Sequence, residues 1–153
     1  MRRERYGLST FPTRILLATD GSKEAALAAR AAVDLADKTG SELHVAHVAP
    51  FVPMPFAYTE TEPAQREQEA RKLLDEQVEK IEASGGTIAQ AYLRMGKEAE
   101  EIVTLGEEIG AGLIVVGSRG LGGMRRVLMG SVSDSVVRHA HCPVLVVRNE
   151  EKQ

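Results

Sequence analysis

The sequence predicts an α/β fold: a five-stranded parallel sheet with strand order 3-2-1-4-5 and helices on both faces. Short apolar runs alternate with longer helical segments along the whole chain, which is typical of parallel sheets covered by helices. Several of the runs carry almost no charge, as expected for strands that are buried on both faces. Loops rich in glycine and hydroxyl groups follow the first and the fourth run. In an open parallel sheet a ligand binds beyond the carboxyl ends of the strands, where the strand order reverses.

The length of 153 residues fits one domain, which we assign to residues 11–149, after a flexible basic extension over residues 1–10. The single cysteine, Cys142, excludes an intrachain disulfide. A net charge of −3, no tryptophan and 4% aromatic residues argue against a nucleic-acid partner. The chain has neither a signal-peptide pattern nor an apolar run long enough for a membrane span. These features predict a cytoplasmic protein with no membrane partner.

The first half of the chain predicts two strands and two helices. "RILLA" (14–18) is a buried strand, and "TDGS" is the turn after it. An alanine-rich helix follows and stops at Gly40, and a second strand covers 42–49. Residues 50–63 contain four prolines and predict a long loop. A charged helix with an apolar stripe covers 64–83.

The second half predicts three strands and two helices. The strand at 87–95 alternates in polarity, which places it nearer an edge of the sheet. A helix over 97–110 and a buried strand over 111–117 follow. After a glycine-rich loop come a short helix over 132–140 and a last strand over 143–147, with Pro143 at its first position, where a missing N–H is tolerated.

The loop "GSRGLGGMRRVLMGS" (117–131) matches none of three familiar binding or catalytic motifs. No glycine is followed by Lys-Ser or Lys-Thr, so it is not a Walker A loop. A dinucleotide fingerprint fails because its third glycine position is Arg125, and no G-x-S-x-G nucleophile elbow occurs.

The same loop has features that suit a phosphate group. Gly117 leaves the end of a strand bare, Gly120 allows a positive φ, and Gly130-Ser131 begins a helix whose free N–H groups attract anions. The hydroxyls of Ser131 and Ser133 add two donors. Counter-charge is available from three arginines: Arg119, Arg125 and Arg126.

A plainer interpretation stays open beside this one. The glycines form a flexible connector, Ser131 is only a helix N-cap, and Asp134 completes a capping box with it. For Arg125 and Arg126 two roles stay open: contact with the phosphates, or contact with a second copy of the chain or another partner.

The chain resembles the universal stress protein family. Its ATP-binding members carry G-x-x-G, nine residues, then G-[S/T], and here Gly117-x-x-Gly120 is followed by nine residues and Gly130-Ser131. "RILLATDGS", "ELHVAHV" and "GLIVVGSRG…HCPVLVVR" resemble the family's first strand, second strand and C-terminal third. The resemblance implies a Rossmann-like fold of the adenine nucleotide α-hydrolase type.

The resemblance also implies a role for each matching residue. Thr19 and Asp20 line the adenine and ribose end, and Val48 contacts adenine. The nucleotide lies on Val116 and Gly117, with Arg119 and Gly120 along its ribose and phosphates. The phosphates themselves are held by Gly130, Ser131, Val132 and Ser133.

The implied cofactor is ATP, with Mg²⁺ or a similar cation bridging its phosphates. The implied partner is a second copy of the chain, paired through the 143–147 strand, because an apolar edge strand is otherwise a pairing hazard. The chain departs from some relatives at Ala18 and Arg119 without losing a needed donor.

Three other site hypotheses are weak. His139, His141 and Cys142 lack a second ligand pair at zinc spacing. His44 and His47 lie on opposite faces of their strand, so they cannot share a ligand, and His47 is expected to be a packed strand residue. No base is placed by spacing to complete a catalytic triad with Asp20 and Ser131, and Cys142 is expected to be buried.

These features predict an ATP-binding, homodimeric module that acts in a stress response by changing its conformation or assembly. They assign no catalytic residue and no protein-bound metal. The alternatives are a slow ATP-hydrolysing or AMP-forming enzyme that uses Asp20 or Asp134, and an interaction protein that binds no nucleotide.

Overall fold

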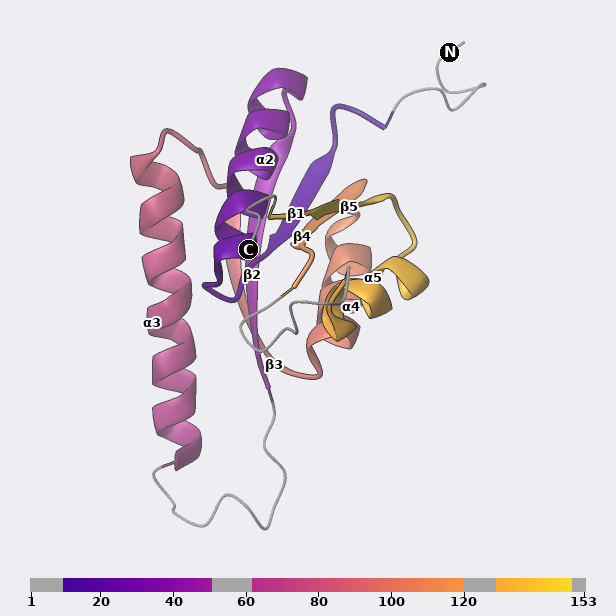
Figure 1. The fold of residues 1–153 in the computed structure, drawn as a ribbon. Helices are drawn as coiled ribbons and strands as arrows, with labels where there is room; N and C mark the ends of the chain where they lie inside the picture. The colour runs from indigo at the N-terminus through magenta and orange to yellow at the C-terminus, as the bar shows by residue number, and fades with distance from the viewer. Residues whose placement is uncertain (1–9, 51–61, 120–128, 150–153) are drawn as a thin grey trace.

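The computed structural model describes residues 10–50, 62–119 and 129–149. Strands and helices alternate along these residues as the sequence predicts (Figure 1). The elements are β1 (Arg14–Ala18), α2 (Lys23–Thr39), β2 (Glu42–Pro50), α3 (Glu62–Ala83), β3 (Gln90–Gly96), α4 (Glu98–Ile109), β4 (Leu113–Gly117), α5 (Ser131–His139) and β5 (Val144–Val147).

The sheet has the strand order β3-β2-β1-β4-β5, and all four neighbouring pairs are parallel. This confirms the predicted order, and it confirms the edge position of the strand that alternates in polarity. β1 pairs with β2 on one side and with β4 on the other. The strand order therefore reverses next to β1, and the chain leaves β1 and β4 in different directions.

Helices cover both faces of the sheet, α2 and α3 on one and α4 and α5 on the other (Figure 1). Successive residues of a strand point to opposite faces, so Ile15 and Leu17 pack towards α2 and α3 while Leu16 packs towards α4 and α5. All three side chains are fully buried. The apolar run of β1 thus fills the cores on both sides of the sheet.

Short local interactions set the ends of the helices. The Ser22 hydroxyl accepts a hydrogen bond from the Ala25 N–H and caps α2, and Gly40 ends that helix with a φ of 69°, as predicted. α3 begins at Glu62, two residues earlier than predicted. Residues 51–61, which hold most of the predicted proline-rich loop, lie outside the described residues, as do residues 1–9 of the predicted N-terminal extension.

Three strands begin later than predicted. β3 begins at Gln90 because Gly85 and Gly86 bend the chain after α3, and Ile88 packs on the core before strand pairing starts. β4 begins at Leu113 because the Ala111 N–H still bonds to Gly106 at the end of α4. β5 begins at Val144, with Pro143 just before it. Apolar residues beside a strand look like strand residues in a sequence pattern.

Among the described residues, no helix is long and apolar enough to cross a membrane.

We expect Leu16→Ala to lower the free energy of unfolding by about 3 kcal/mol, because it leaves a cavity between β1 and the α4–α5 layer. Val137→Ala removes a side chain that is 45% exposed and is expected to cost less than about 0.5 kcal/mol. Urea unfolding of both variants measures the difference. Equal losses would contradict the assignment of Leu16 to the core.

Candidate functional site

A cavity of about 440 Å³ lies at the carboxyl ends of β1, β2 and β4, beside the start of α5. This volume is in the range of sites that hold small molecules. The predicted site residues that line it are Thr19, Asp20, Val48, Val116, Gly117, Arg119, Gly130, Ser131, Val132 and Ser133. Gly120, Arg125 and Arg126 lie outside the described residues. The fold therefore gathers in one cavity residues that are more than a hundred positions apart in the sequence.

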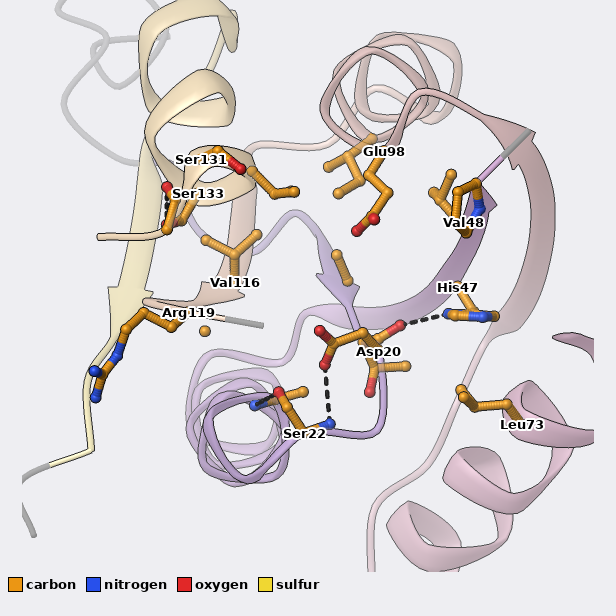
Figure 2. Close-up of a pocket in the computed structure, with 18 residues that line it drawn as sticks. Asp20, Ser22, His47, Val48, Leu73, Glu98, Val116, Arg119, Ser131 and Ser133 are labelled. Atoms are coloured by element: carbon orange, nitrogen blue, oxygen red, sulfur yellow. Dashed lines mark hydrogen bonds between the residues drawn. The ribbon is translucent and has the colours of Figure 1, made fainter. Parts of the chain in front are cut away.

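The turn after β1 is held by hydrogen bonds within it and to its neighbours. Thr19 is buried, and its hydroxyl accepts a bond from the Gly21 N–H at 3.4 Å. The Asp20 carboxylate accepts a bond from the Ser22 N–H at 2.9 Å. In Figure 2 the Asp20 side chain lies at the floor of the cavity. An ionisable group is thus fixed at the point where the strand order reverses.

Gly117 is required for a reason that the sequence did not reveal. A Cβ atom on Gly117 would lie 2.8 Å from the carbonyl carbon and the Cβ atom of Glu24, in the first turn of α2. The sequence predicts only that Gly117 leaves the strand end bare, and the structure adds that a side chain here would collide with the backbone of α2. Gly117 allows α2 to pack closely on the end of β4.

At the start of α5, several backbone N–H groups have no partner among the described residues. Gly130 is the N-cap and supplies no side-chain cap, so the interpretation of Ser131 as the N-cap is wrong. Asp134 does not complete a capping box, because its carboxylate bonds to Arg138 at 2.9 Å. Within the described part of the chain, the N–H groups of residues 131–133 and the Ser131 hydroxyl form no hydrogen bond. The helix dipole adds partial positive charge at this end.

Ser133 has a different role from Ser131. It is 3% exposed, and its hydroxyl donates to the Ser118 carbonyl at 2.7 Å and lies 3.1 Å from that of Gly130. A hydroxyl has one hydrogen to donate. The prediction of Ser133 as a second hydroxyl donor is therefore wrong for this structure. Its hydroxyl instead links the start of α5 to the segment after β4, and only its N–H is directed towards the free end of the helix.

Arg119 lies at the rim of the cavity. Its guanidinium Nη2 is 3.7 Å from Glu24 Oε2, and both side chains are largely buried. Figure 2 shows the guanidinium directed away from Asp20 and Glu98. Its charge is thus partly balanced within the protein.

Apolar side chains also line the cavity. Val48 and Val116, both buried, contribute to the lining together with Ile102 from α4 and Leu73 from α3. His47 also lines the cavity. It is 8% exposed and its Nδ1 donates to the Thr19 carbonyl at 2.8 Å, so it is a packed strand residue, as predicted, and a wall residue as well.

Glu98 is a cavity residue that the sequence analysis missed. It is the first residue of α4, and in Figure 2 its carboxylate points into the cavity towards Asp20. Burial raises the pKa of Glu98, the negative charge of Asp20 raises it further, and His47 opposes the rise. No residue pattern marks Glu98, although the rule that helix starts gather at the carboxyl ends of parallel strands would have placed α4 nearby. The other missed lining residues are Ala18, Ser22, Ala25, His47, Pro50, Leu73 and Ile102.

The weaker site hypotheses lie away from this cavity. Among the described residues no three His, Cys, Asp or Glu side chains are grouped for a metal ion. His139 bonds to the Ser135 carbonyl, and His141 lies 3.3 Å from Glu107. Cys142 is only half-buried, not buried as predicted, and desolvation raises the pKa of its thiol. His44 contacts Tyr92 and Glu42.

Comparison with known proteins decides the family. The model of the universal stress protein family matches residues 12–148. The chain belongs to this family. It is similar to the universal stress protein MJ0531 of Methanocaldococcus jannaschii, with 35% identity over 92% of this chain and 84% of that protein.

Solved structures of universal stress proteins and related chains share the fold. The structure of MJ0577 has a TM-score of 0.79 and 26% identity, covering 93% of this chain and 99% of that one. A universal stress protein solved in complex with cAMP has a TM-score of 0.68 and 26% identity, covering 91% and 98%. The universal stress protein fold, of the adenine nucleotide α-hydrolase type, is thus the fold of this chain.

We expect Gly117→Ala to lower the free energy of unfolding by about 1–3 kcal/mol, because the added methyl group overlaps the first turn of α2. Urea unfolding without added ligand isolates this packing effect. An unchanged free energy of unfolding together with a loss of ligand affinity would contradict this packing role, because Gly117 would then affect only the ligand.

Proposed function

We propose that this universal stress protein binds an adenine nucleotide, ATP in particular, in the cavity at the carboxyl ends of the strands. The observation that carries the proposal is the pairing of two unlike ends in one cavity. One end has the apolar side chains of Val48 and Leu73 (Figure 2), and the other holds N–H groups at the start of α5 that bond to no described residue. A purine base suits the first and a phosphate group the second.

Two further observations support the proposal. The spacing Gly117-x-x-Gly120, nine residues, Gly130-Ser131 matches that of the ATP-binding members that the chain resembles. A relative of the same fold was solved in complex with cAMP, an adenine nucleotide.

In this assignment Val48 and Val116 contact the base, and Thr19 and Asp20 lie beside the base and ribose. Arg119 and Gly120 follow the ribose and phosphates, above Gly117. The phosphates bind the N–H groups at the start of α5 and the Ser131 hydroxyl. The residues that hold them are Gly130, Ser131, Val132 and Ser133, the last through its N–H alone.

A Mg²⁺ ion fits this site only as a companion of the phosphates. Mg²⁺ in nucleotide sites takes phosphate oxygens, water and one or two carboxylates as ligands. Among the described residues the cavity offers two carboxylates, Asp20 and Glu98. Asp20, at the end of β1, would orient a water ligand of an ion that the phosphates carry in.

We further propose that two copies of the chain pair through β5. The Pro143 and Val147 carbonyls accept bonds from β4. Backbone groups of a strand alternate in direction, so those of Val144 and Val146 point away from β4. Within the described residues that side of β5 is unpaired, and a second copy would cover it.

The role we propose is regulatory: nucleotide binding sets the conformation or assembly of a cytoplasmic dimer in a stress response. Enzymatic turnover of ATP is a weaker candidate for the function. Asp134 is bonded to Arg138, and the Asp20 carboxylate already accepts a bond within its own turn. Neither is arranged as a free general base for an attacking water.

Ser131→Pro tests the phosphate site with little cost to the helix. Proline is favoured at the first position of a helix, and here it removes one backbone N–H together with the Ser131 hydroxyl. Gly130 already has the extended backbone that precedes proline. We expect ATP affinity to fall about 10- to 100-fold, because hydrogen bonds to a charged group are lost.

The matched control is Ser131→Ala, which keeps the N–H and removes the hydroxyl, and we expect a loss of about 3- to 10-fold. Calorimetry measures both, after mass spectrometry has identified any nucleotide that copurifies with the parent protein. If Ser131→Pro binds ATP as tightly as the parent, the phosphates do not bind at the start of α5.

Val146→Pro tests the dimer. It removes an N–H that points away from β4, which an edge strand tolerates, and it blocks pairing with a second copy. We expect sedimentation to show dimers of the parent and monomers of the variant, with unchanged circular dichroism. A folded variant that remains a dimer would rule out pairing through β5.

A further inference from the structure

Glu98 stands out among the residues that line the cavity because its charge opposes the proposed ligand. Its side chain is half-buried, it comes from the start of α4, and its carboxylate points into the cavity (Figure 2). It also lines a second hollow of about 350 Å³, shared with Ser131 and Val132 at the start of α5. Glu98 thus lies between Val48 and the start of α5, the proposed phosphate end (Figure 2).

The charged and titratable groups around Glu98 do not neutralise it. Asp20 faces it from the end of β1 with the same charge, and His47 faces it from β2. Arg119, after β4, is paired with Glu24 and directed away from it. Lys97, the N-cap residue before Glu98, lines the second hollow, but its Nζ lies 3.8 Å from Glu100 Oε2 and its side chain is largely exposed. Of the residues lining the cavity from α3 and α5, Leu73 and those of 131–133 carry no charge.

We propose that Glu98 sets the charge selectivity of the cavity: its carboxylate disfavours the phosphates of a triphosphate relative to an uncharged nucleoside, and triphosphate binding is linked to uptake of a proton by Glu98. The inference rests on the proposed nucleotide site. Like charges in a partly desolvated cavity repel more strongly than in water. A bound triphosphate therefore favours the neutral carboxylic acid.

The sign of the pH dependence follows from this repulsion. The pKa of Glu98 is already raised above its ordinary value of 4.5, and an anionic ligand raises it further, so the complex binds more protons than the free protein. Affinity for a triphosphate then increases as the pH falls towards the pKa of Glu98. Affinity for adenosine, which has no phosphate, does not follow this trend.

The experiment compares the parent with Glu98→Gln, which keeps the shape of the side chain and removes its charge. The matched control is Glu100→Gln, in the same turn of α4, with a side chain that is 69% exposed and outside the cavity. Calorimetry with ATP and with adenosine from pH 5 to pH 8, in buffers of different ionisation enthalpy, measures affinity and proton uptake.

We expect Glu98→Gln to bind ATP about tenfold more tightly than the parent near neutral pH and adenosine within about twofold. Proton uptake attributable to Glu98 should disappear in the variant, so the parent and the variant converge at low pH. Glu100→Gln should behave like the parent. ATP binding by Glu98→Gln alone, with none by the parent, would also support the inference.

Other results would overturn the inference. Intact ATP binding with equal affinity in the parent and Glu98→Gln would overturn it while leaving the proposed function in place. An equal gain for adenosine would show an effect of shape, and an equal gain in Glu100→Gln would show a general effect of surface charge. If neither the parent nor the variant binds an adenine compound, the proposed function fails and the inference fails with it.

Discussion

The parallel pairing of β1 with both β2 and β4 is the constraint on which the rest of the structure depends. It places a fully apolar strand at the centre of the sheet, where its side chains fill the cores on both faces. Because the chain runs from β1 to α2 on one face and from β4 towards α5 on the other, the two loops separate at this point. The cavity is the space that remains between them.

Close packing of α2 on the end of β4 holds this edge of the sheet together. The absence of a Cβ atom at Gly117 brings the first turn of α2 against the strand end, and the Ser133 hydroxyl joins the start of α5 to the same segment through the Ser118 carbonyl. Two helix starts are thereby fixed relative to one strand end. Backbone N–H groups can bind an anion well only if they are held in place before it arrives.

The electrostatics of the cavity are mixed rather than uniformly positive. The start of α5 offers partial positive charge, whereas Asp20 and Glu98 bring two carboxylates to the same space. The strength with which such a site binds a charged ligand depends on the ligand's charge and on pH. Under the proposed function, this dependence would regulate binding without a large change of shape.

The sequence by itself determined the family and most of the cavity residues, because the signals for these are local, and the strand order followed from the family resemblance. Buried parallel strands are continuous apolar runs, and the motif from Gly117 to Ser131 lies in one stretch of chain. Sequence reasoning was wrong where an apolar run extends past its strand, as before Gln90, and where a serine resembled a helix cap. Only the tertiary structure decided that Gly117 packs against Glu24, that Ser133 is bonded within the protein, and that Glu98 faces Asp20. Each of these facts depends on a distance between segments far apart in the sequence, and such distances are set by how helices pack on the sheet, not by the pattern within any one segment.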